Sequence, residues 1–131
     1  MSPTERSLAY RQPMTRPTGT RPRPQSVTPR SLAHLRRQGY LVAKVEHWNH
    51  FARKRQDVFG FDLLAIWSMP PGGRIVGVQV TTASNVASRV KKLRALPTTD
   101  PWLHAGGSIV VHGWSLRGRG RKVWTLRDVW L

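Results

Sequence analysis

The residues best suited to chemistry in this sequence are polar side chains that interrupt two apolar runs. Asp62 lies within the run 58–67, and Gln79 and Thr81 lie near the end of the run 74–81. An acid inside an apolar run is costly to bury unless backbone donors or a cation satisfy it. Carboxylate and carbonyl oxygens on adjacent strands can bind Mg²⁺, which activates a bound water for attack on phosphorus. Asp62 is therefore either a metal ligand or a carboxylate held by backbone donors.

Two further acids and two histidines lie close to these runs. Glu46 and Asp57 flank the basic segment Arg53-Lys54-Arg55. Each acid either completes a carboxylate cluster or forms a surface ion pair with that segment. His47 and His50 have no third soft ligand nearby, so they are only a weak signal for zinc. The absence of cysteine excludes disulfides, thiolate zinc sites and cysteine nucleophiles.

The candidate residues need strands to bring them together, and the sequence predicts a helix followed by three strands. Thr28 is suited to cap a helix whose first position is Pro29, and Gly39 is suited to end it. Turn residues at 69–73 connect two apolar runs as antiparallel neighbours. The expected elements are a helix at 28–38, a strand at 40–46, a loop at 49–56, and strands at 58–67 and 74–81.

A second helix and two further strands follow in the sequence. Apolar residues recur on one helical face over 86–96, and Pro97 ends that helix. Strands are expected at 108–114 and 123–130, with a flexible cationic tip over 117–122. Helices and strands that alternate in this way predict an α/β fold with a mixed sheet.

Charge is a second line of evidence on function. The chain has 131 residues, with 22 Lys or Arg against 6 Asp or Glu, and a formal net charge of +16. Residues 1–27 are basic and rich in proline, which predicts a disordered arm ahead of one domain at 28–131. A surface this basic favours nucleic acid as the partner. The alternative is a soluble basic protein that binds no nucleic acid.

The placement of Asp62, Gln79 and Thr81 ahead of a basic helix resembles the PD-(D/E)XK nuclease superfamily. The segments Phe59-Gly60-Phe61-Asp62-Leu63-Leu64-Ala65 and Val78-Gln79-Val80-Thr81 look like the two strands that carry its motif. The resemblance spans roughly residues 28–114 and implies a restriction-endonuclease-like αβββαβ core. It is nearest to small phage-encoded or prophage-encoded nucleases and Holliday-junction resolvases.

The resemblance also implies roles for individual residues. Asp62, the amide oxygen of Gln79 and the main-chain carbonyl of Val80 would bind Mg²⁺ or Mn²⁺, and Thr81 would assist the attacking water. Gln79 is neutral where a glutamate is commoner, and Thr81 replaces the usual lysine, so a fixed positive charge is missing. The first helix lacks the acid that the superfamily often carries there. The cations whose segments border the expected cleft are Lys44, Lys54, Lys91 and Lys92.

Basic and aromatic side chains outside the motif are candidates for nucleic-acid contact. Trp48 and Trp102, in expected loops, are suited to stack on bases or sugars. Trp124, Leu126 and Trp130 share strand parity and are expected in the core. The basic residues expected to contact phosphates are Arg53, Lys54, Arg55, Arg89, Lys91, Lys92, Arg117, Arg119, Arg121 and Lys122.

These observations favour a metal-dependent nucleic-acid phosphodiesterase, acting on DNA rather than RNA and reading shape or ends rather than sequence. Two alternatives stay open: an inactive protein of the same fold that binds DNA or RNA, and a basic structural protein associated with a phage or ribosome. Resolvase-like members commonly act as dimers on branched DNA, so a homodimer also stays open. No run reaches the ~18 apolar residues of a membrane span, and no secretion signal is seen, so a cytoplasmic location without a membrane partner is expected.

Overall fold

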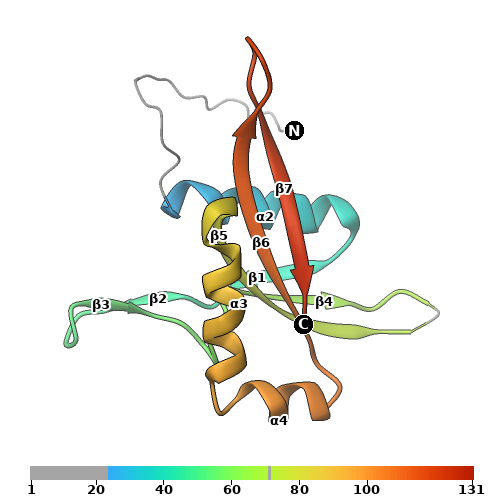
Figure 1. Ribbon diagram of the computed structural model, residues 1–131. Helices are drawn as coiled ribbons and strands as arrows, with labels where there is room; N and C mark the ends of the chain where they lie inside the picture. The colour runs from blue at the N-terminus through green and yellow to red at the C-terminus, as the bar shows by residue number, and fades with distance from the viewer. Residues whose placement is uncertain (1–23, 71) are drawn as a thin grey trace.

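A mixed sheet with helices on both faces organises the chain in the computed structural model, which describes residues 24–70 and 72–131 (Figure 1). The elements are α2 (Pro24–Gln38), β1 (Leu41–Lys44), β2 (His47–Asn49), β3 (Lys54–Gln56), β4 (Leu63–Trp67), β5 (Arg74–Thr82), the 3₁₀ helix η1 (Ala83–Asn85), α3 (Val86–Ala95), α4 (Thr99–His104), β6 (Ser108–Arg117) and β7 (Val123–Trp130). The predicted α/β class with a mixed sheet is confirmed. Among the described residues, no helix is long and apolar enough to cross a membrane.

The five-stranded sheet has the order β1-β4-β5-β6-β7. Strands β1, β4 and β5 form an antiparallel meander, in which the pairing of β4 with β5 confirms the hairpin predicted from the turn residues at 69–73. Strand β6 runs parallel to β5, and β7 returns antiparallel to β6. A parallel neighbour requires a crossover, and the segment η1-α3-α4 provides it. The short hairpin β2–β3 forms a separate two-stranded sheet.

Each face of the sheet is covered by one part of the chain. Val76, Val78 and Val80 point to the face covered by α2, where they pack with Val27 and Leu35. The opposite face is covered by α3 and α4, which pack on a cluster formed by Phe61, Val86, Leu93, Ile109 and Val111. Figure 1 shows α2 and α3 on opposite sides of the strands. This alternation along β5 is what directs Gln79 and Val80 to different faces.

Close packing fixes the segment that leads into β4. A Cβ at Gly77 would clash with the ring of Phe61, so only glycine lets this ring lie flat on the sheet. Phe61 also packs against Trp102, with ring centroids 4.9 Å apart. Phe61 directly precedes Asp62 in the chain. Burial of its ring therefore helps to fix the position of the Asp62 backbone.

The first helix begins at Pro24, so the predicted start at Thr28 is wrong. Val27 is fully buried in the core, and this burial extends the helix toward the N-terminus. Pro29 lies inside the helix rather than at its first position. The predicted arm, residues 1–27, lies largely outside the described residues.

The predicted strand 58–67 starts only at Leu63. Phe59 and Gly60 have positive φ angles of 55° and 86°, which no regular strand accommodates. They form a tight turn closed by a bridge between Val58 and Phe61. Asp62 therefore lies directly before β4 rather than within a strand.

Three other boundaries differ from the predictions. The predicted loop 49–56 contains the end of β2 and all of β3, whose polar strands give no hydrophobic pattern. The turn after Pro97 contains the short helix α4. Strand β6 continues to Arg117, past the predicted end at 114, because it stays paired with β7.

Candidate active site

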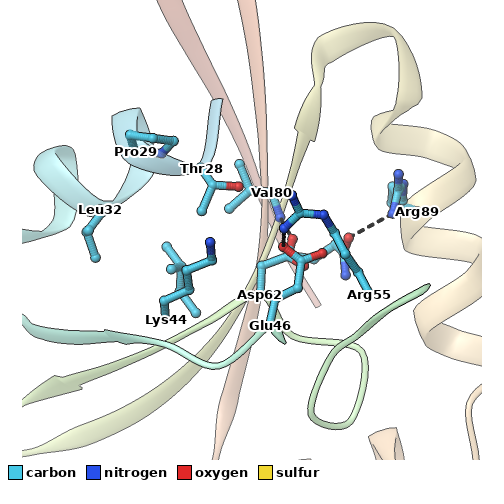
Figure 2. Close-up of a pocket in the computed structure, with 11 residues that line it drawn as sticks. Thr28, Pro29, Leu32, Lys44, Glu46, Arg55, Asp62, Val80 and Arg89 are labelled. Carbon is cyan, nitrogen blue, oxygen red and sulfur yellow. Dashed lines mark hydrogen bonds and ion pairs between the residues drawn. The ribbon is translucent and has the colours of Figure 1, made fainter. Parts of the chain in front are cut away.

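A pocket of about 240 Å³ opens where β4 begins and where β5 ends (Figure 2). Its walls come from the first half of α2, the end of β1, the base of the β2–β3 hairpin and α3. The lining residues are Thr28, Pro29, Leu32, Lys44, Glu46, Arg55, Asp62, Leu63, Gln79, Val80 and Arg89. The predicted candidates Asp62, Gln79, Val80 and Glu46 thus come together in one pocket.

Asp62 is fixed by four hydrogen bonds to the backbone. Its N–H donates to the Val78 carbonyl, and its own carbonyl accepts from the N–H groups of Val45 and Glu46. Its carboxylate oxygen Oδ2 accepts from the Val80 N–H over 2.8 Å. The side chain is almost fully buried, and these contacts hold it at the floor of the pocket. Both roles considered for Asp62 therefore have a physical basis. A backbone donor satisfies one carboxylate oxygen, and the side chain also lines a pocket in which a cation could bind.

Burial raises the pKa of Asp62 to about 6. The hydrogen bond from Val80 lowers this pKa, the negative charges of Glu46 and Asp57 raise it, and Arg89 lowers it. Desolvation is the largest of these effects, because it penalises the charged form of a carboxylate. Because burial destabilises the charged form of this carboxylate, a cation bound next to it would stabilise that form.

Gln79 is held at both ends of its amide group. Its Nε2 donates to the Gly60 carbonyl, and its Oε1 accepts from Arg89 over 2.9 Å. These two contacts fix which way the amide points, so Oε1 is the atom on the Arg89 side. An amide oxygen has two lone pairs, so Oε1 keeps one after binding Arg89. Thr81 is also buried, but it does not line this pocket.

The two flanking acids have different surroundings. Glu46 lines the pocket and lies 3.6 Å from the guanidinium of Arg55. Asp57 accepts a hydrogen bond from the Gly60 N–H and lines a smaller hollow next to Gln79 and Arg89. The ion pair predicted for Glu46 is thus present, while Asp57 supports the turn that precedes Asp62.

Three cations line the pocket, namely Lys44, Arg55 and Arg89. Lys44 extends from the end of β1 toward the carboxylates (Figure 2). The other candidate replacements for the superfamily lysine lie elsewhere, since Lys54 is on the exposed hairpin and Lys91 on the exposed side of α3. Lys92 lines only the neighbouring hollow. Lys44 is the lysine that the fold brings to the site.

The remaining cationic candidates lie on exposed surfaces. Arg117 ends β6, and Arg119, Arg121 and Lys122 occupy the exposed connection to β7. In Figure 1 this connection projects beyond the rest of the sheet. Arg89 differs, because it is half-buried and bonded to Gln79, so it belongs to the pocket as well as to the basic surface.

The oxygen donors available for a cation are few. In residues 24–70 and 72–131, no group of three or more His, Cys, Asp and Glu side chains is placed to hold a metal ion. His47 and His50 therefore do not form a zinc site with other described residues. A Mg²⁺ ion that keeps several waters needs only one or two carboxylates, so the oxygen donors of Asp62, Val80 and Gln79 suit a hard cation such as Mg²⁺ or Mn²⁺.

Two tryptophan predictions are wrong. Trp102 lies in α4 rather than in a loop, and it packs on Phe61 and donates its Nε1–H to the Ser108 carbonyl. Trp130 is 45% exposed and lies near the Arg74 guanidinium at the edge of the sheet. Trp124 and Leu126 are half-buried and pack against the core, as predicted.

A second polar cluster, missed by sequence reasoning, is buried beneath α2. Trp114 Nε1 donates to Ser31 Oγ over 2.8 Å, and Ser31 Oγ lies 2.8 Å from His112 Nδ1. Because indole only donates, Ser31 Oγ is the acceptor in its contact with Trp114, and its second contact joins it to the His112 ring. Burial lowers the pKa of His112 to about 4, with a further lowering by His34. Only tertiary structure joins these residues, so no local sequence signal could have found them.

Comparison with known proteins adds no family assignment. No protein-family model, curated protein or solved structure matches the chain.

Proposed function

We propose that this protein is a metal-dependent nuclease that hydrolyses phosphodiester bonds in DNA. The observation that carries the proposal is the contact between the Asp62 carboxylate and the Val80 backbone, at the floor of a pocket lined by three cations. A buried carboxylate beside main-chain oxygen suits a hard cation, and surrounding cations suit a phosphate. The order α2-β1-β4-β5-α3-β6 supports the proposed kinship with PD-(D/E)XK nucleases.

The chain offers a consistent donor set for Mg²⁺. The N–H of Val80 points at Asp62, and in an extended strand the carbonyl of a residue points to the same side as its N–H. The Val80 carbonyl therefore faces the space beside the Asp62 carboxylate, with Gln79 Oε1 as a further donor. Bound there, Mg²⁺ would lower the pKa of a water molecule and polarise the phosphate.

The other pocket residues bind and orient the substrate. Lys44 stands where a fixed positive charge can stabilise the phosphate as negative charge builds on it, which is the task of the missing superfamily lysine. Arg89 orients Gln79 through its hydrogen bond. Arg55 is held by Glu46 at the rim, where it can contact the adjacent phosphate.

The test is cleavage of labelled single-stranded, duplex and branched DNA with Mg²⁺, with Mn²⁺ and with chelator. The Asp62→Asn variant is expected to lose cleavage while it keeps DNA affinity, because the change also removes charge repulsion from phosphate. Asp100→Asn, an exposed acid on α4, is the matched control and is expected to cleave normally. Cleavage that survives in Asp62→Asn, or that needs no metal, would contradict the proposal.

A second candidate function is DNA binding without cleavage. It is favoured by Thr81, which is buried and supplies no positive charge where the superfamily uses lysine. In this case the protein binds DNA in a salt-dependent manner, and no metal ion produces cutting. Salt dependence alone does not separate the two candidates, so the metal arms of the cleavage assay decide.

A further inference from the structure

The β2–β3 hairpin presents an aromatic side chain at its tip with nothing packed on it. Phe51 has a relative exposure of 101%, the highest among the exposed large apolar residues. In Figure 1 the hairpin extends away from the main sheet. Leaving a phenylalanine in water forgoes about 2 kcal/mol of burial, so a residue of this type at such a position is suited to contact a partner.

The tip is held in shape by its own hydrogen bonds. Asn49 Oδ1 accepts from the backbone N–H groups of Phe51 and Ala52, both over 2.9 Å. Asn49 Nδ2 donates to Gln56 Oε1 over 2.8 Å, which ties the two strands together. Arg53 completes the turn with a φ of 56°. Phe51 is thus presented on a preorganised turn, which reduces the entropy lost on binding.

The surface around Phe51 is positively charged. Arg53 and Lys54 are exposed, and within the part of the chain that the structure describes neither forms an ion pair. A cationic surface with an apolar tip complements a polyphosphate backbone with stacked bases inside it. The same surface does not complement an apolar partner that lacks acidic groups, because the charges of Arg53 and Lys54 would be buried there without counter-charges.

One side of the hairpin leads back to the pocket. Trp48 lies directly opposite Arg55 in the ladder, so both side chains are on the same face. Arg55 also contacts Glu46 at the pocket rim, and Trp48 beside it is half-exposed. Four residues from Glu46 to the turn span about 13 Å in an extended strand, which is about four base-pair steps.

From these contacts we infer that the β2–β3 hairpin is a wedge that separates stacked base pairs in double-helical DNA. Phe51 inserts between two base pairs, while Arg53 and Lys54 bind the phosphates beside the opened step. The choice of DNA as partner rests on the proposed function. Insertion costs least where bases are already poorly stacked, so the wedge favours branched or distorted DNA and opens it about four steps from the bound phosphate.

The wedge can be tested without cleavage in the full-length Asp62→Asn protein. The probe is duplex DNA with 2-aminopurine, a base whose fluorescence rises when it is unstacked, placed at successive positions. Binding by Asp62→Asn is expected to raise the fluorescence at one or two adjacent positions. Adding Phe51→Ala should abolish this rise and weaken duplex binding about tenfold, with a smaller loss on DNA that is already unpaired at that position. Adding Phe51→Leu should keep most of the signal.

Matched controls distinguish a wedge from a side chain that only stacks on exposed bases. Met69→Ala removes another exposed apolar side chain, at the β4–β5 connection, and is expected to change neither signal. A loss of affinity by Phe51→Ala that is equal on single-stranded and duplex DNA would overturn the wedge in favour of simple stacking. An unchanged fluorescence rise in Phe51→Ala would overturn it outright.

The wedge and the proposed function can fail independently. Metal-dependent cleavage that requires Asp62, without unstacking that requires Phe51, supports the nuclease and rejects the wedge. Unstacking that requires Phe51, without any cleavage by the wild-type protein, supports the wedge and rejects the nuclease.

Discussion

The carboxylate of Asp62 accepts a hydrogen bond from the backbone N–H of Val80, so the side chain that precedes one strand is fixed to the backbone of the next. This contact orients the carboxylate without neutralising it. Burial at the same time raises the pKa of Asp62 to about 6. Burial thus destabilises the charged form of Asp62 when no cation is bound, which agrees with its proposed role as a metal ligand.

Asp62→Asn is expected to stabilise the protein at pH 7 in the absence of metal. The folded state holds the Asp62 proton up to about pH 6, whereas the unfolded state releases it near 3.8. This group therefore stabilises the fold fully only at low pH, and the contribution is lost as pH rises from about 4 to 6. Asparagine removes the penalty, which is worth about 3 kcal/mol at pH 7 if the whole shift is realised.

The measurement is urea unfolding with chelator at pH 7 and pH 4. The free energy of unfolding of Asp62→Asn should exceed that of wild type at pH 7, and the difference should shrink at pH 4. A variant that is less stable than wild type at pH 7 would mean that Asp62 is primarily a structural carboxylate.

Metal affinity should depend on pH through the same residue. At the proposed site Mg²⁺ would bind the ionised carboxylate, so binding would displace the proton whenever pH lies below about 6. The Kd for Mg²⁺, measured by calorimetry without DNA, is expected to weaken about tenfold per pH unit below that value and to level off above it. Release of protons should accompany binding at pH 5.5. A Kd that is constant from pH 5 to 7 would exclude Asp62 as the ligand.

Lys44→Ala should slow cleavage far more than it weakens DNA binding. Lys44 lines the pocket, whereas Lys54 lies on the exposed hairpin, so the two lysines form a matched pair. Removing a charge that stabilises the reacting phosphate is expected to lower kcat about a hundredfold. Lys54→Ala should instead weaken binding and reduce the salt slope by about one unit. Equal effects of the two changes on kcat and on affinity would show that Lys44 is only a binding residue.

The local parts of the fold and site were predictable from the sequence. Strands β4 and β5 follow from apolar runs bounded by turn residues, and they bring Asp62 next to Gln79 and Val80 without any long-range information. The helix start was not predictable, because burial of Val27 depends on packing into a core built by strands that are distant in the sequence. The burial of Val27 stabilises the longer helix more than an N-cap at Thr28 would stabilise the shorter one.

The partners of the site residues depend on tertiary geometry. The hydrogen bond between Arg89 and Gln79 requires that α3 be rotated about its own axis so that Arg89 faces β5. Helical periodicity alone does not determine this rotation. The same periodicity predicts Arg89 equally well as an exposed cation. Trp130 shares strand parity with half-buried Trp124, yet it is 45% exposed, so the alternation of side chains along β7 does not by itself determine burial.

Ser31→Ala is expected to destabilise the protein by about 2–4 kcal/mol, since it leaves the buried Trp114 N–H and His112 Nδ1 without partners. Ser68→Ala, at an exposed position after β4, is the control and should change stability by less than about 0.5 kcal/mol. Urea unfolding at pH 7 measures both. A loss in Ser31→Ala no larger than in the control would show that water replaces the serine hydroxyl.

His112 gives the protein a dependence on pH that is opposite in sign to that of Asp62. Its folded pKa is lowered from 6.5 to about 4, so the unfolded state binds its proton first and stability is lost as pH falls from 6.5 toward 4. In wild type this loss is offset between pH 6 and 4 by the stability that Asp62 gains on protonation. The stability of the wild-type protein should therefore vary little across this range. In Asp62→Asn only the His112 contribution remains, so its free energy of unfolding should fall steadily from pH 6.5 to pH 4, and a flat profile would show that His112 is protonated in the fold.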